Sequence, residues 1–75
     1  MKELLEFILE NILKGKDFEI ETVEEGDKTT FNIKVPEEKA GLVIGKSGRT
    51  IKAIRNLLKV KATLEKKLVF LTITN

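Results

Sequence analysis

The 75-residue sequence contains no cysteine and no histidine. These absences exclude disulfide bonds, thiolate and imidazole metal ligands, and the usual nucleophile and base pairs of hydrolases. We therefore expect no enzyme activity and no metal site, and nothing in the sequence implies a cofactor. Tryptophan and tyrosine are also absent, and all four aromatic residues are phenylalanine.

Long apolar runs are missing as well. The N-terminal stretch MKELLEFILENILKGK carries Glu3, Glu6 and Glu10 inside its apolar pattern, which is unlike a signal peptide or a membrane span. We expect a cytoplasmic protein without a membrane segment. At this length only about 60% of the unfolded surface can be buried, so we expect residues 1–75 to form one small domain of modest stability.

The charges are distributed unevenly along the chain. Residues 1–45 contain 6 lysines and 11 acidic residues, whereas residues 46–75 contain 8 lysines and arginines and a single acidic residue, Glu65. The first part therefore carries a net charge of −5 and the second +7, which gives +2 in total. This asymmetry favours an anion-binding face in the second part. The alternative is a thermally adapted surface rich in lysine and glutamate.

Two helices are predicted in the first 45 residues. Apolar residues recur at helical spacing near the N-terminus, at Leu4, Leu5, Ile8, Leu9, Ile12 and Leu13. This pattern predicts an amphipathic helix, and Gly15 offers a natural stop. A short second helix is predicted over residues 36–44, PEEKAGLVI, because proline suits a first turn and two glutamates complement the positive end of the helix dipole. Gly45 then ends it.

Strands are predicted where apolar and polar residues alternate. Between the two helices the apolar positions of this alternation are Phe18 and Ile20, then Phe31, Ile33 and Val35. They predict a hairpin with one buried face, turning at Gly26 and Asp27. Residues 68–74, LVFLTIT, predict a last strand. Leu68 and Phe70 point opposite to its other apolar side chains, so either both faces are covered or one apolar stripe is left for a partner.

From Arg49 to about Val60 the pattern is helical again. At about 100° per residue, one arc is apolar and the adjacent arc is basic, with Ile51, Ile54, Leu57 and Leu58 in the first and Arg49, Lys52, Arg55 and Lys59 in the second. The following residues 60–64, VKATL, alternate like a strand and also continue the helix, and both assignments stay open. The predicted order is helix, strand, strand, helix, helix, strand.

Residues 40–50, AGLVIGKSGRT, raise the question of a nucleoside-triphosphate-binding loop. A Walker A loop, G-x-x-x-x-G-K-[ST], would need its first glycine at position 40, where this chain has Ala40. No later strand offers an acidic residue for magnesium, and 75 residues cannot supply a doubly wound parallel sheet. The sequence therefore disfavours an ATPase or GTPase.

A four-residue turn between two helices explains the same motif better. Gly45, Lys46, Ser47 and Gly48 can bring backbone N–H groups and the start of the next helix to a phosphate chain without a side chain in the way. Lys46 and Arg49 add positive charge there. A lone GxxG is weak evidence, because a corner between helices often needs glycine for geometry alone. VIGKSGRTIKAI is more specific, since it joins the turn to both apolar flanks and to the basic stripe.

The stretch GLVIGKSGRTIKAI, residues 41–54, resembles the core motif of the KH domain, which binds RNA and single-stranded DNA and whose GxxG loop clamps about four nucleotides. The chain looks most like the small stand-alone bacterial KH proteins of the KhpA type. The resemblance extends over nearly the whole chain and implies the type II KH fold, an α+β domain of order α-β-β-α-α-β. In that fold helices lie on one face of a three-stranded mixed sheet, whose first strand is antiparallel and whose last is parallel to the second.

The resemblance also assigns roles by position. It implies that Gly45, Lys46, Ser47 and Gly48 hold the sugar-phosphate backbone of single-stranded RNA. Gly41 and Leu42 would border the bases. The residues expected mainly in the core are Val43, Ile44, Ile51 and Ile54. From distance to the turn we expect phosphate contacts from Arg49, Lys52 and Arg55, and only a diffuse attractive field from Lys59, Lys61, Lys66 and Lys67.

The sequence thus favours a non-catalytic single-stranded RNA-binding protein. With four phenylalanines and no other aromatic residue, it disfavours a stacking platform of the RRM or OB type and favours a narrow apolar groove with weak base preference. The resemblance implies an RNA chaperone or post-transcriptional regulator that forms a homodimer or a heterodimer with a larger KH-domain protein. The alternative is a KH-fold interaction module with little direct RNA binding, which contacts partners through Leu68 and Phe70 or through Phe7.

Overall fold

The computed structural model describes residues 1–74. Its elements follow the order α1 (Lys2–Leu13), β1 (Glu19–Glu25), β2 (Lys28–Lys34), α2 (Glu37–Ile44), a 3-10 turn η1 (Lys46–Gly48), α3 (Arg49–Leu64) and β3 (Leu68–Thr74). The strands form one sheet in the order β1-β2-β3, with β1 antiparallel and β3 parallel to β2. The predicted α+β class, element order and mixed three-stranded sheet are confirmed.

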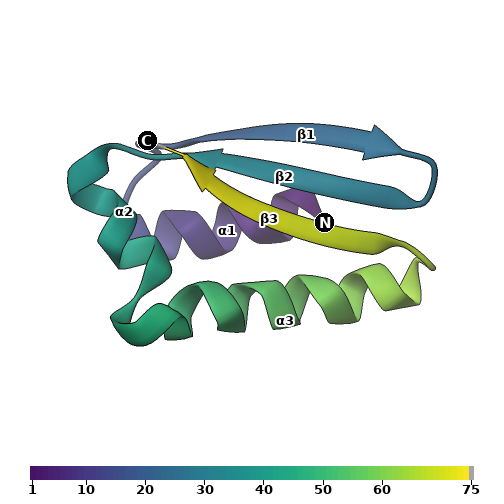
Figure 1. Ribbon diagram of the computed structural model, residues 1–75. Coiled ribbons are helices and arrows are strands. Elements are labelled where there is room, and N and C mark those ends of the chain that lie inside the picture. Colours follow the sequence, from purple (N-terminus) through teal and green to yellow (C-terminus); the bar gives the residue numbers. More distant parts are fainter. Residues whose placement is uncertain (75) are drawn as a thin grey trace.

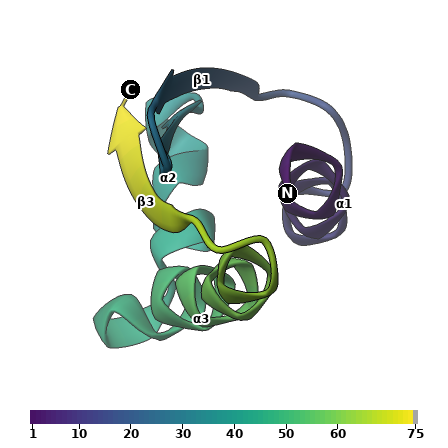
Figure 2. The same cartoon turned by 90° about the vertical axis from the view of Figure 1, so that its right-hand side faces the viewer.

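The helices lie on one face of the sheet (Figure 1). Helices α1 and α3 run antiparallel to each other beneath it, with α3 on the side of β3 and α1 on the side of β1 (Figure 2). The core between these layers draws side chains from all of them, including Leu5, Leu9, Phe31, Ile33, Val43, Ile54, Leu58 and Leu71. Within residues 1–74, no helix has both the length and the apolar character needed to cross a membrane.

The end of α1 differs from the expectation at Gly15, and the end of α3 decides between the two assignments left open for residues 60–64. Lys14, not Gly15, takes the left-handed conformation after α1, at φ 54° and ψ 46°. The N–H of Gly15 then donates to the carbonyl oxygen of Glu10 at 3.1 Å, which closes the helix end in the manner of a Schellman motif. Helix α3 continues to Leu64, so the segment 60–64 is helical and not a strand.

One residue of the expected apolar face of α3 is on the outside. Ile54 and Leu58 are buried and Ile51 is half-buried, but the Leu57 side chain is 54% exposed. Leu57 lies about 100° around the helix from Leu58, and no element covers that side of α3 within residues 1–74 (Figure 2). The expectation that Leu57 belongs to the core face was therefore wrong.

Strand β3 forms one edge of the sheet and shows two different faces. Leu71 is buried and Val69 and Ile73 are half-buried towards the helices. Leu68 and Phe70 point to the opposite face, where both remain exposed. Of the two arrangements that the sequence allowed, the structure has the one with an uncovered apolar stripe.

Candidate nucleic-acid interface

The turn between α2 and α3 depends on an unusual backbone. Gly45 lies at φ 77° and ψ 173°, Ser47 at φ 58° and ψ 26°, and Gly48 at φ 74° and ψ 15°. A Cβ atom at Gly45 would lie 2.6 Å from the Cβ and 2.8 Å from the backbone nitrogen of Thr50, whereas one at Gly48 would meet nothing within 4 Å. Gly45 is therefore needed for both conformation and space, and Gly48 for conformation alone.

This backbone leaves donors available at the tip of the turn. Gly48 N–H donates to the Gly45 carbonyl at 3.1 Å, and Arg49 N–H donates to the Lys46 carbonyl. Among the turn and cap hydrogen bonds of residues 1–74, none is donated by the N–H groups of Lys46 or Ser47. Both residues are exposed, so these two N–H groups can bind an acceptor such as a phosphate oxygen.

The start of α3 adds positive potential at the same place. Gly48 precedes the helix without a side-chain cap, and the first turn contains no acidic residue, so the positive end of the helix dipole is not compensated. Lys46, Arg49 and Lys52 are exposed around it. The ion pairs within residues 1–74 are Lys16–Glu10, Lys39–Asp17 and Lys67–Glu24, and none of them uses a cation of the turn or of α3.

Further along α3 a hollow lies beside β3. Lys52, Arg55 and Lys59 fall within one arc of about 60° on the helix. Arg55 and Lys59 line a hollow of about 480 Å³ between α3 and β3, together with Ala62, Thr63 and residues 67–71. We call this hollow the basic groove. The structure thus brings Arg55 together with Lys59 and Lys67, two residues that the sequence placed only in a diffuse field.

Lys67 and β3 line the groove because of the tertiary fold, and local sequence patterns do not reveal that placement. The parallel pairing of β3 with β2 sets Leu71 opposite Phe31 and brings the edge strand alongside α3 (Figure 2). Periodicity identifies each element but not this long-range pairing. The available signal was the type II KH topology, in which the last strand lies parallel to the second, next to the helix that follows the GxxG turn.

The residues of α2 that precede the turn fall on different sides of that helix. Val43 is buried as expected, but Ile44 is exposed, so its assignment to the core was wrong. The helix has only eight residues and buries only Ala40 and Val43. Gly41 and Leu42 are both exposed and lie about 100° apart around the helix. Ile44 lies about 60° from Gly41, so Gly41 shares its side of α2 with Ile44 more than with Leu42.

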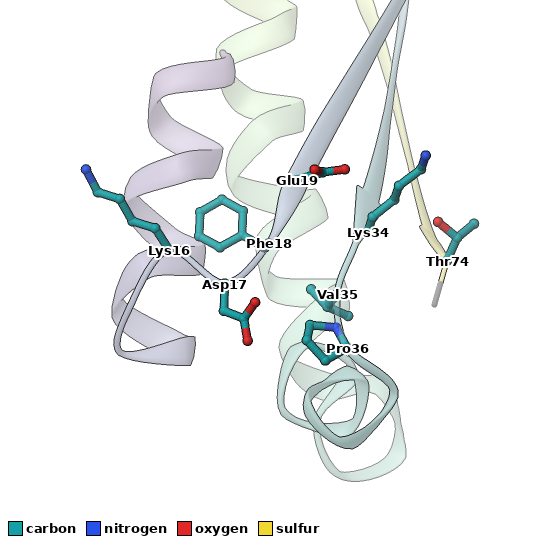
Figure 3. A pocket seen from close by; sticks show the side chains of 8 residues that line it. All are labelled: Lys16, Asp17, Phe18, Glu19, Lys34, Val35, Pro36 and Thr74. Atoms are coloured by element: carbon teal, nitrogen blue, oxygen red, sulfur yellow. The ribbon is translucent and has the colours of Figure 1, made fainter.

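A larger hollow of about 680 Å³ lies at the other end of α2, away from the turn. Figure 3 shows Lys16 and Lys34 on opposite sides of it, with Phe18 and Pro36 between them. Its charged side chains have both signs, and the Lys39 ammonium nearby is 3.1 Å from the Asp17 carboxylate. This balance of charge makes it a poorer site for a polyanion than the basic groove.

A mixed three-stranded sheet with helices on one face, and a GxxG turn leading into a basic helix beside the edge strand, define a type II KH domain. The family described as "KhpA/KhpB, KH domain" matches residues 2–73 of the sequence. The chain belongs to this family of KH-domain proteins.

Several relatives carry the name RNA-binding protein KhpA, and three of them illustrate the similarity. The protein of Thermotoga maritima is 48% identical over 59 residues, covering 77% of this chain and 79% of the relative. The protein of Clostridium perfringens is 39% identical over 74 residues, covering 97% and 99%. The protein of Chlamydia trachomatis is 37% identical over 73 residues, covering 87% and 94%. No solved structure gives a significant match.

Proposed function

We propose that this protein binds single-stranded RNA and holds its sugar-phosphate backbone with the turn Gly45–Gly48. The observation that carries the proposal is the coincidence, at one point, of two free backbone N–H groups, an uncapped helix start and cations without acidic partners. Membership of a family whose relatives are named RNA-binding protein supports it.

In this proposal the strand leaves the turn and follows the basic groove. Arg49, Lys52 and Arg55 contact successive phosphates, and Lys59 extends the row. From Arg49 to Lys59 the helix rises about 15 Å, which suits the few nucleotides that a KH domain holds. N–H groups and cations directed at phosphates carry no base information, so binding tolerates many sequences. Gly41 and Leu42 border the first bases.

The proposed role is non-catalytic. A protein that grips RNA mainly by its backbone can act on many transcripts, which fits an RNA chaperone or post-transcriptional regulator in the cytoplasm. The preference for single strands follows from the groove, because bases that enter it must be unpaired and splayed away from a helix.

The test is fluorescence anisotropy of a labelled single-stranded RNA of random sequence over a salt series. Lys46→Asp combined with Ser47→Asp should abolish binding, because the added carboxylates repel phosphate and obstruct the free N–H groups. Lys2→Asp combined with Asn11→Asp changes the net charge equally, but on α1, away from the turn, and should bind like the wild type. Circular dichroism checks that both variants fold. If the two double variants bind equally, the turn is only a structural corner.

A second surface supports the partner part of the proposal. Three side chains on the outside of α3 are apolar and strongly exposed: Leu57 at 54%, Val60 at 63% and Leu64 at 77%. We call them the outer stripe. Together with the exposed Ala53 they repeat at steps of four, three and four residues, the spacing of a coiled-coil seam.

Helix α1 also carries exposed apolar side chains. Lys2, Glu6 and Glu10 line a hollow with Phe18 and Ile20, so that side of α1 faces β1. Leu4 and Phe7 lie on the side of α1 opposite to its buried residues Leu5, Leu9 and Leu13. Both side chains are exposed.

We propose that a second copy of this chain covers the outer stripe in a two-fold dimer. A larger KH-domain protein would compete for the same stripe. The dimer presents two GxxG turns to one RNA and raises avidity through effective concentration.

Sedimentation equilibrium tests this arrangement. The wild type should be a dimer at micromolar concentration and Val60→Glu a monomer, since the charge falls at the centre of the stripe. The Lys46→Asp, Ser47→Asp variant should remain dimeric. A monomeric wild type would overturn the dimer. A dimeric wild type that binds no RNA would instead favour the function of an interaction module.

A further inference from the structure

Phe70 lies at the far end of the basic groove from the GxxG turn. It lines the groove together with Arg55, Lys59 and Lys67, yet its side chain points to the open face of the sheet. The residue is 46% exposed, and the Lys28 ammonium nitrogen lies 5.0 Å from the centroid of its ring. The apolar ring therefore lies between cations at the edge of the basic groove.

We propose that Phe70 stacks on a nucleobase, the base of the nucleotide that leaves the basic groove over the edge of β3. The inference rests on the proposed RNA binding and adds a base-binding position to it. It is a single position at the end of the groove and not a platform of several aromatic residues.

The distance from the turn fits this place in the path. Phe70 shares the groove with Lys59 and Thr63, which lie about 16 and 22 Å along α3 from Gly48. The turn and the first part of the groove hold about four nucleotides in a KH domain. A base at Phe70 therefore belongs to the nucleotide that follows this segment.

The charges around the ring also favour a nucleotide. Lys59 and Lys28 lie on the two sides of the β3 edge, one in the groove and one on the open face. A strand that crosses the edge meets cations before and after the ring. The Lys28 ammonium covers part of the ring by a cation–π contact and is placed to bind the phosphate that follows the stacked base.

The rest of the open face argues against a protein partner at this ring. Asn32 donates to the Glu21 carboxylate at 2.9 Å, and the Thr72 hydroxyl donates to the Asn32 carbonyl, which forms a polar row across all three strands. Apolar side chains near Phe70 on this face are limited, within residues 1–74, to Val23 and Leu68. A protein interface needs a larger apolar centre, whereas one stacked base needs only the ring.

The absence of tryptophan and tyrosine allows a direct measurement. Phe70→Trp creates the sole indole of the protein, whose fluorescence is quenched when a base stacks on it. We expect strong quenching by an unlabelled single-stranded octanucleotide and much weaker quenching by a tetranucleotide, which ends before the ring. Glu19→Trp, at an exposed position on β1 at the opposite edge of the sheet, is the matched control and should not be quenched by either RNA.

Affinity gives the second readout. Phe70→Leu keeps an apolar side chain without a π-face and should weaken octanucleotide binding about tenfold, with little change for the tetranucleotide, while Phe70→Tyr should bind like the wild type. If anisotropy shows RNA binding but the indole of the Phe70→Trp variant is not quenched and Phe70→Leu binds normally, stacking is refuted and the proposed function stands. If the folded wild type binds neither RNA, both proposals fail.

Discussion

Replacing Gly45 with alanine is expected to destabilise the protein more than any other alanine substitution in the GxxG turn. At φ 77° and ψ 173° the residue occupies a region that is essentially restricted to glycine, and a side chain there costs about 2 kcal/mol. The new Cβ would also lie 2.6 Å from the Thr50 Cβ, an overpacking that costs about 2 kcal/mol more. Together these terms lower the free energy of unfolding by about 4 kcal/mol.

Thermal unfolding followed by circular dichroism measures this loss. In a domain of this size 1 kcal/mol shifts the melting temperature by about 4–8 °C, so Gly45→Ala should melt about 15–30 °C below the wild type. Gly48→Ala is the control, because its new Cβ would also stand on a residue with a positive φ, 74°, but would meet no atom within 4 Å. We therefore expect it to lower the free energy of unfolding by only about 1 kcal/mol. Equal losses in the two variants, or a larger loss at Gly48, would refute the described packing of Thr50 against the turn.

Three further predictions test other parts of the molecule. Ser47→Gly should raise the free energy of unfolding by about 1 kcal/mol, because it relieves a left-handed serine at φ 58°; a lower melting temperature would contradict this. Leu58→Ala should cost about 3 kcal/mol in urea denaturation and Leu57→Ala less than about 0.5 kcal/mol, so similar losses would contradict their opposite burial. Lys59→Gln should reduce the slope of log affinity against log salt by about 0.7, whereas Lys61→Gln, on the other side of α3, should leave it unchanged; equal slopes would exclude Lys59 from the RNA path.

Local patterns in the sequence were sufficient for the elements of the fold. The alternation at Phe31 and Ile33 and the helical repeat at Leu5 and Leu9 each depend on neighbours within one element, and the structure has those elements and the hairpin turn. The turn at Gly45 was likewise identified by its own residues.

The failures concern contacts between elements. Leu57 and Ile44 are as apolar as their buried neighbours, and only the placement of the other helices leaves them exposed. Lys67 lies beside Arg55 because β3 returns parallel to β2, a pairing between distant segments that no local period encodes. Lys14 adopts the left-handed conformation that was expected of Gly15. This conformation costs a lysine only about 1 kcal/mol, so the geometry of the connection to β1 can determine which residue adopts it.

The two edges of the sheet are protected unequally. β1 carries four glutamates among its seven residues, whereas β3, LVFLTIT, carries no charge. Charged side chains discourage an edge strand from pairing with a strand of another molecule. Only β1 is protected in this way. A carboxylate on β3 would discourage strand pairing but would repel the phosphates of the proposed RNA path. Protection by acidic residues, as on β1, is therefore incompatible with RNA binding at β3, and RNA held along this edge would itself prevent pairing with another strand.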